Sequence, residues 1–214
     1  PGLVWRGLPL PGRVPTSVAL SGLLPAGRES LDAFLAPLVA LSEPGAWAPH
    51  PATWVVAVDY GSGARTCFGA PGAPETGIRE AVRASCTVPG VFPPVRIGDR
   101  EYVDGGVHSA TSVDLVIDQP LDEVIVLAPM AGQPRRPPRS PVQAADLVVR
   151  RLMHRRLAAE CARVRRAGIR VRLLVPSTED LAAMTGNPLD PRRRIGVFEA
   201  AMRSAPARIA AVLA

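Results

Sequence analysis

The sequence predicts an α/β fold, in which helices cover both faces of a layered sheet. Two nearly continuous apolar runs, Trp54–Val58 and Glu123–Ala128, are bounded by turn residues, as expected for buried strands. Segments with helical periodicity alternate with them along the chain. Because 214 residues are enough to bury a substantial core, a single domain over 1–214 is expected.

Residues 1–52 are expected to form a loop and helix region. Proline and glycine are frequent in 1–26, which favours a surface linker over a lid that covers a binding cleft. Apolar residues then recur at helical spacing and predict a helix over Ser30–Leu41, with Ser30 as its N-cap. Pro37 should end or kink this helix.

The region 53–130 is expected to contain the core. The run Trp54–Val58 should pair with Arg65–Gly69 across a turn at Gly61-Ser62-Gly63. Asp59 ends the first of these strands. A structural role for this carboxylate, binding nearby backbone, is favoured over a catalytic role.

A helix, a proline-containing loop and a hairpin should follow this strand pair. Thr76 is the expected N-cap of the helix, and Pro89 requires the helix to end before it. Gly98-Asp99 is typical of a two-residue hairpin turn, and the returning strand Tyr102-Val103 leads into Asp104. The inward-facing residues of the helix are expected to be Ile78, Ala81, Val82 and Ser85.

Asp104 is followed by Gly105 and Gly106, the only adjacent glycine pair in the chain. A carboxylate at a strand end can act as a general base, and glycines permit positive φ and the close approach of another group. Asp-Gly is also the commonest hairpin dipeptide, so the tripeptide alone favours a simple turn.

Two longer strings change this balance: ASCTVPGVFPP at 84–94 and YVDGG at 102–106 closely resemble the patatin-like phospholipase family. The resemblance extends to WVVAVD at 54–59, TCFG at 66–69 and EVIVL at 123–127. It implies a three-layer α/β/α sandwich that hydrolyses acyl esters of lipids through a Ser-Asp dyad.

The resemblance also implies roles for individual residues. Asp104 would be the catalytic base of the dyad, and Gly105 and Gly106 would keep its carboxylate approachable. Ser85 and Pro89 would line the site. His108 matches no motif position and is expected to be a loop residue.

The family's nucleophile lies in a G-x-S-x-G motif, and this motif is absent from the 214 residues. Gly61-Ser62-Gly63 has the wrong spacing, and Ser85 lacks flanking glycines. The chain is therefore expected to be the C-terminal part of a patatin-like hydrolase, without its N-terminal strand-elbow-helix unit. Such a piece should be inactive alone, expose an apolar sheet edge and dissolve poorly.

Residues 131–214 are arginine-rich, with helices expected over 142–167, 179–184 and 192–213 and an edge strand over 169–175. Residues 1–134 hold eight arginines against 13 acidic residues and residues 135–214 hold 17 against six, so their charges are −5 and +11. A solvated face is the default interpretation. The alternative function is a catalytically inactive relative that binds anionic lipid or a protein partner through this region.

Other classes of function are disfavoured. Aromatic residues make up 4% of the chain and are not interleaved with the basic runs, which argues against nucleic-acid binding. Cys67, Cys86 and Cys161 form neither a disulfide framework nor a zinc motif, so no metal or cofactor is expected. Buried free thiols favour a reducing, cytoplasmic location with peripheral contact to a membrane, since no apolar run of about 18 residues is present.

Overall fold

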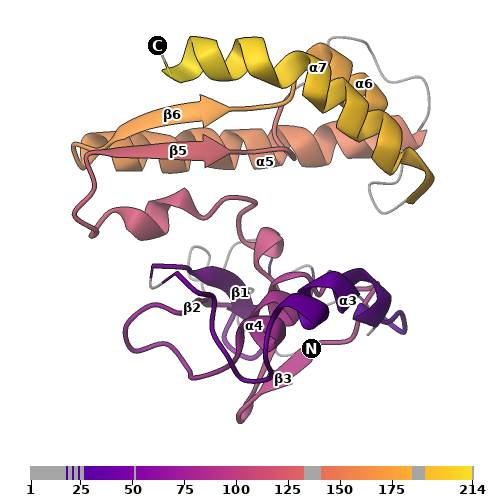
Figure 1. The fold of residues 1–214 in the computed structure, drawn as a ribbon, viewed down its shortest axis with the longest axis vertical. Helices are drawn as coiled ribbons and strands as arrows, with labels where there is room; N and C mark the ends of the chain where they lie inside the picture. The colour runs from indigo at the N-terminus through magenta and orange to yellow at the C-terminus, as the bar shows by residue number, and fades with distance from the viewer. Residues whose placement is uncertain are drawn as a thin grey trace. The chain divides into compact units, whose positions relative to one another are not determined.

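The computed structural model describes residues 18, 21, 24, 27–50, 52–132, 141–184 and 191–213. The chain divides into two compact units, Pro1–His108 (unit 1) and Ser109–Ala214 (unit 2), each with its own sheet (Figure 1). Both units mix strands and helices, so the predicted α/β class is confirmed. None of the described helices combines the length and apolarity needed to cross a bilayer.

Unit 1 contains a four-stranded antiparallel sheet in the order β2-β1-β4-β3. Val58 of β1 is paired with Arg65 of β2 and with Val103 of β4, and this confirms the predicted strand pair. Ile97 is paired with Arg100, which leaves two residues for the hairpin turn, as predicted. The strands are β1 (Val55–Asp59), β2 (Arg65–Phe68), β3 (Val95–Ile97) and β4 (Arg100–Asp104).

Helix α4 (Ile78–Ser85) packs on one face of this sheet, and it ends before Pro89 as predicted. Its N-cap is Gly77, and the expectation of Thr76 was wrong. The N–H of Ile78 donates to the carbonyl of Ala46 at 2.9 Å, so this donor is satisfied without a side-chain cap. The core formed with the sheet consists of Ala57, Phe68, Ala81, Ala84, Ile97 and Tyr102.

Helix α3 (Asp32–Leu41) departs from the sequence prediction at its N-cap. Its N-cap is Leu31, while the hydroxyl of Ser30 accepts the N–H of Asp32 at 3.1 Å. Pro37 lies inside the helix and does not end it. This proline is exposed, so water can bind the carbonyl that loses its intrahelical partner.

Unit 2 is built around two parallel strands, β5 (Glu123–Leu127) and β6 (Arg170–Leu174). Val171 and Leu173 point toward helix α5 (Pro141–Arg166) and join its apolar cluster. Arg172 points to the opposite face, where its guanidinium contacts the carbonyl of Val212 in helix α7 (Arg194–Leu213). Helices α5 and α7 therefore cover opposite faces of β6 (Figure 1).

The segment between the two sheets is held by a buried carboxylate of α5. Glu160 is fully buried and accepts hydrogen bonds from the hydroxyls of Ser109 at 2.9 Å and Thr111 at 3.0 Å. After these two residues, the 3₁₀ helix η2 covers Val113–Val116. Ser112 precedes it in the left-handed region, with a φ of 48°.

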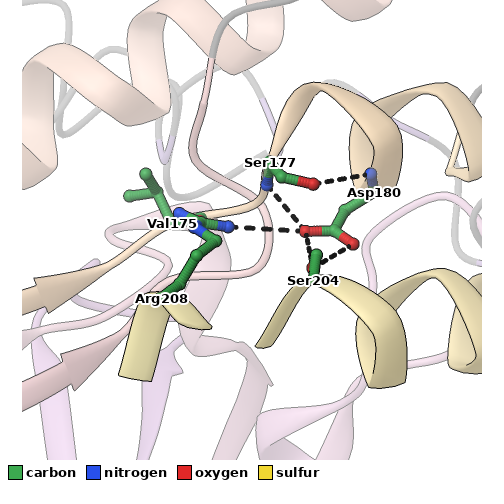
Figure 2. A network of polar contacts seen from close by, with 5 residues as sticks. All are labelled: Val175, Ser177, Asp180, Ser204 and Arg208. Carbon is green, nitrogen blue, oxygen red and sulfur yellow. Dashed lines mark hydrogen bonds and ion pairs between the residues drawn. The ribbon is translucent and has the colours of Figure 1, made fainter. Parts of the chain in front are cut away.

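A second polar cluster fastens α7 to α6 (Thr178–Ala183), as Figure 2 shows. The Ser204 hydroxyl lies 2.8 and 2.9 Å from the two carboxylate oxygens of Asp180, and the Ser177 N–H donates at 2.7 Å. Burial raises the pKa of Asp180, but these bonds and the Arg208 guanidinium outweigh it, and the pKa is lowered. A carboxylate of reduced basicity is a poor proton acceptor, so this Ser–Asp pair is a structural clamp.

Candidate active site

Asp104 is the last residue of β4, paired with Ala57 of β1. Its N–H donates to the carbonyl of Thr87 at 2.9 Å, so its main chain is held by both β1 and the loop after α4. Its Oδ1 accepts the N–H of Gly106 at 2.6 Å and thereby caps the short helix η1 (Gly105–Val107). The side chain is thus oriented by backbone groups.

The two glycines after Asp104 are needed for space and not for conformation. Neither has a positive φ, so the conformational freedom that glycine permits is not used here. A Cβ atom on Gly105 would lie 2.3 Å from the carbonyl oxygen of Val56, and one on Gly106 would lie 2.9 Å from Oδ1 of Asp104. The expected close approach is therefore confirmed, and β1 is one of the approaching groups.

The environment of Asp104 makes its carboxylate more basic. Burial raises the pKa of this group, and the hydrogen bond from the Gly106 N–H offsets only part of the effect. A carboxylate whose charged form is disfavoured accepts a proton more readily than an exposed one.

Ser85 is the last residue of α4 and lies beside β1. Its hydroxyl donates to the carbonyl of Val56 at 2.7 Å, the group that also lies against Gly105. The proton of Ser85 is therefore engaged by backbone and not by Asp104. This geometry fits a residue in the wall of the site better than a nucleophile.

Two residues beside Asp104 were not singled out from the sequence. Thr87 is fully buried, and its hydroxyl donates to the carbonyl of Arg83 at 2.7 Å, which fixes the carbonyl that binds Asp104. Burial raises the pKa of the Cys86 thiol, and the charge of Asp104 raises it further. Only their position next to Pro89 in the resembling string could have drawn attention to them.

Pro89 lies in a tight turn that continues this loop. The N–H groups of Val91 and Phe92 both donate to the carbonyl of Val88, at 3.1 and 3.0 Å. Gly90 makes the turn possible with a φ of 84°.

A sequence model of patatin-like phospholipases matches residues 2–117, more than half of the chain. The chain belongs to the patatin-like phospholipase family. The match begins well before position 53, where the resemblance starts, and ends before β5. No curated protein matches the chain.

Membership of the patatin-like family relates the chain to enzymes that hydrolyse lipid acyl esters. The matched residues include all of unit 1 from position 2 onward, and with it Ser85, Pro89, Asp104, Gly105 and Gly106. Their assignment as site residues stays a prediction. The structure brings Ser85 and Gly105 together at the Val56 carbonyl, and Asp104 precedes this glycine, paired with Ala57.

The other candidate residues lie apart from this cluster or serve the backbone. Asp59 is paired with Tyr102 in the β1–β4 register and binds the turn that follows β1, in line with the structural role favoured for it. His108 follows η1, and its N–H donates to the carbonyl of Gly105 at 3.0 Å. Within the described residues, no group of three or more His, Cys, Asp or Glu side chains could hold a metal ion.

Proposed function

We propose that this protein is a serine acyl hydrolase of lipid esters in which Asp104 is the general base. The observation that supports this most directly is the environment of Asp104. It ends a buried strand, its Oδ1 is oriented by one backbone N–H, and burial raises its pKa. A Ser-Asp dyad needs such a carboxylate, because no histidine relays the proton.

In the proposed reaction, a serine oxygen attacks the acyl carbonyl carbon while Asp104 accepts the serine proton. The tetrahedral intermediate collapses, and Asp104 returns this proton to the departing alcohol. Water then attacks the acyl-enzyme with Asp104 again as base, which releases the fatty acid and restores the serine. Gly105 and Gly106 keep the carboxylate approachable.

The serine and the oxyanion-binding amides belong, in this proposal, to a part of the protein outside these 214 residues. The chain has no G-x-S-x-G motif, and the Ser85 hydroxyl is bound to the Val56 carbonyl. Fluorophosphonate labelling with peptide mapping tests this, on the chain alone and on the intact protein from its source. Labelling of an upstream serine in the intact protein alone supports the proposal, whereas labelling within residues 1–214 would contradict it.

Replacement of the base tests the dyad in the intact protein. Asp104→Asn should reduce ester hydrolysis by about 10²- to 10⁴-fold, the usual contribution of a general base. The fold should persist, because the Asn carbonyl can still accept the Gly106 N–H. Asp59→Asn is the matched control and should leave turnover nearly unchanged. Wild-type turnover in Asp104→Asn would refute the assignment.

A second function, contact with an anionic membrane surface, is favoured by helix α7. Its inner side is fastened by Arg172, Ser204 and Arg208, so its outer side faces solvent. There, large apolar side chains are between 41 and 72% exposed on a helix that begins at Arg194, which is also exposed. These side chains are Ile195, Phe198, Met202, Ile209 and Leu213.

Contact with a membrane surface agrees with the proposed location, which is a reducing cytoplasm with peripheral attachment to a membrane. Flotation with phosphatidylcholine vesicles, with and without phosphatidylserine, tests it in the intact protein. Binding should require the anionic lipid, weaken with salt, and fall in Phe198→Ser and Met202→Ser. Equal binding by these variants would contradict a role for α7.

A further inference from the structure

Two large apolar side chains are exposed among the described residues of unit 1. Among the described residues of this unit, only Leu24 and Val88 are both large, apolar and exposed, with 49 and 37% of their surface accessible. Single exposed apolar residues are common on soluble proteins and need no explanation. The position of these two relative to each other and to Asp104 is what carries the inference.

Leu24 and Val88 lie on the same turn. A Cβ atom built on Gly90 would be 3.4 Å from Cδ1 of Leu24 and 3.5 Å from its Cβ, so the Leu24 side chain rests on Gly90. Gly90 lies in the turn that begins at Val88. The Val88 carbonyl closes this turn by accepting the N–H groups of Val91 and Phe92. Two segments distant in the sequence thus present apolar side chains at one place.

The segment that follows Leu24 is fixed to this turn by backbone contacts. The N–H of Glu29 donates to the carbonyl of Val91 at 3.1 Å. Gly27 passes so close that a Cβ atom there would lie 2.0 Å from the carbonyl carbon of Val91. The pairing of Leu24 with the turn is therefore held by neighbouring main chain.

The same turn adjoins Asp104. Val88 directly follows Thr87, whose carbonyl accepts the N–H of Asp104 at 2.9 Å. Thr87 is fully buried and bonded to the carbonyl of Arg83, so this connection is rigid. Val88 consequently belongs to the loop that holds the backbone of the proposed base, and Leu24 packs on Gly90 of the same loop.

We propose that Leu24 and Val88 form an acyl-chain subsite, which binds the first methylene groups of the substrate's fatty acyl chain next to Asp104. This inference rests on the proposed function. Each methylene buried against such side chains contributes about 0.8 kcal/mol, or roughly a fourfold gain in kcat/KM. The site therefore selects esters of longer acyl chains over acetyl and butyryl esters.

The test uses the intact protein and p-nitrophenyl esters of butyrate, octanoate and dodecanoate. Leu24→Asn and Val88→Thr keep the shape of each side chain and make it polar. Each should lower the ratio of octanoate to butyrate kcat/KM about fivefold, with little change in butyrate turnover. The matched controls are Leu152→Asn and Val148→Thr in α5 of unit 2, whose side chains are 60 and 55% exposed. These should leave the ratio unchanged.

The outcomes separate the subsite from the proposed function. Hydrolysis with the same chain-length preference in Leu24→Asn and Val88→Thr as in the wild type would overturn the subsite. If the wild type hydrolysed none of the esters, the proposed function would fail, and binding of the fluorescent fatty acid cis-parinaric acid would decide the subsite. Weaker binding by these two variants than by the α5 controls would support it, and equal binding would overturn it.

Discussion

Two aspartates end paired strands of the same sheet, and their surroundings drive them to opposite chemistry. Asp59 ends β1 opposite Tyr102, and Asp104 ends β4 opposite Ala57. Because the strands are antiparallel, the two carboxylates lie at opposite ends of the pair. Each is followed closely by glycine, so the local sequence alone does not distinguish them.

The two carboxylates differ in how many groups stabilise their charged form: Ser62, through its N–H and its side chain, and then Arg100 act on Asp59, whereas the Gly106 N–H acts on Asp104. Burial raises the pKa of Asp59, but the Ser62 N–H at 2.7 Å and the Arg100 guanidinium at 3.0 Å outweigh it, so the pKa is lowered. At Asp104 burial outweighs the hydrogen bond from the Gly106 N–H, and the pKa is raised. A strand-end aspartate next to arginine is a structural anchor, whereas one held by a single amide keeps its basicity.

The largest expected difference is in the free energy of unfolding, and it separates the two glycines that follow the aspartates: Gly105 after Asp104 and Gly61 after Asp59. Gly105→Ala should destabilise the chain by about 3 kcal/mol, because its Cβ would lie 2.3 Å from the backbone oxygen of Val56 and β1 would have to move. Gly61→Ala is the control, since its Cβ would lie 3.4 Å from Oδ1 of Asp59, an ordinary contact. Denaturant unfolding of both variants measures this. Equal stabilities of the two variants would show that β1 does not constrain the backbone at Gly105.

Removal of the anchoring carboxylate should have the next largest effect. Asp59→Ala should cost about 2 kcal/mol at neutral pH, because the Ser62 N–H and the Arg100 guanidinium lose their acceptor. Arg100→Gln should cost much less than Asp59→Ala, since the arginine side chain is 61% exposed and its ion pair is screened by solvent. A loss as large in Arg100→Gln would assign the stability to the ion pair instead of the turn.

The smallest expected effect is the pH dependence of stability, which should have opposite signs for Asp59 and Asp104. Thermal melts at several pH values measure it. The lowered pKa of Asp59 gives stability above its ordinary value of 3.8, which is lost as the pH falls through the folded-state pKa, so the deficit of Asp59→Ala should shrink in acid. The raised pKa of Asp104 makes its charged form unfavourable. Asp104→Asn should therefore exceed the wild type in stability at neutral pH and lose this advantage below about pH 3.8. Parallel pH profiles would contradict the comparison.

Local sequence patterns predicted the strands and the hairpin of unit 1, because alternation and turn residues act within a few positions. The strand pair β1–β2 and the two-residue turn at Gly98-Asp99 formed as expected. Patterns of this range could not reveal why Gly105 must be glycine, since the constraint comes from Val56, far away along the chain. The same holds for Gly77, whose Cβ would lie 2.9 Å from the Cα of Gly45.

In the candidate site, too, local sequence identified the residues but not the contacts that they make with distant segments. The resembling strings located Asp104, Ser85 and Pro89 within the region that the family match covers. The orientation of Ser85 toward a carbonyl and the meeting of Leu24 with the Val88 turn depend on how separate segments pack. No spacing rule within either segment encodes these contacts.

The carbonyl of Val56 is shared by the end of α4, by β1 and by the glycine after Asp104. Since the role belongs to the peptide group, truncation of the Val56 side chain does not remove it. An amide-to-ester replacement of the bond between Val56 and Ala57, which weakens the carbonyl as an acceptor, is the substitution that exposes this role.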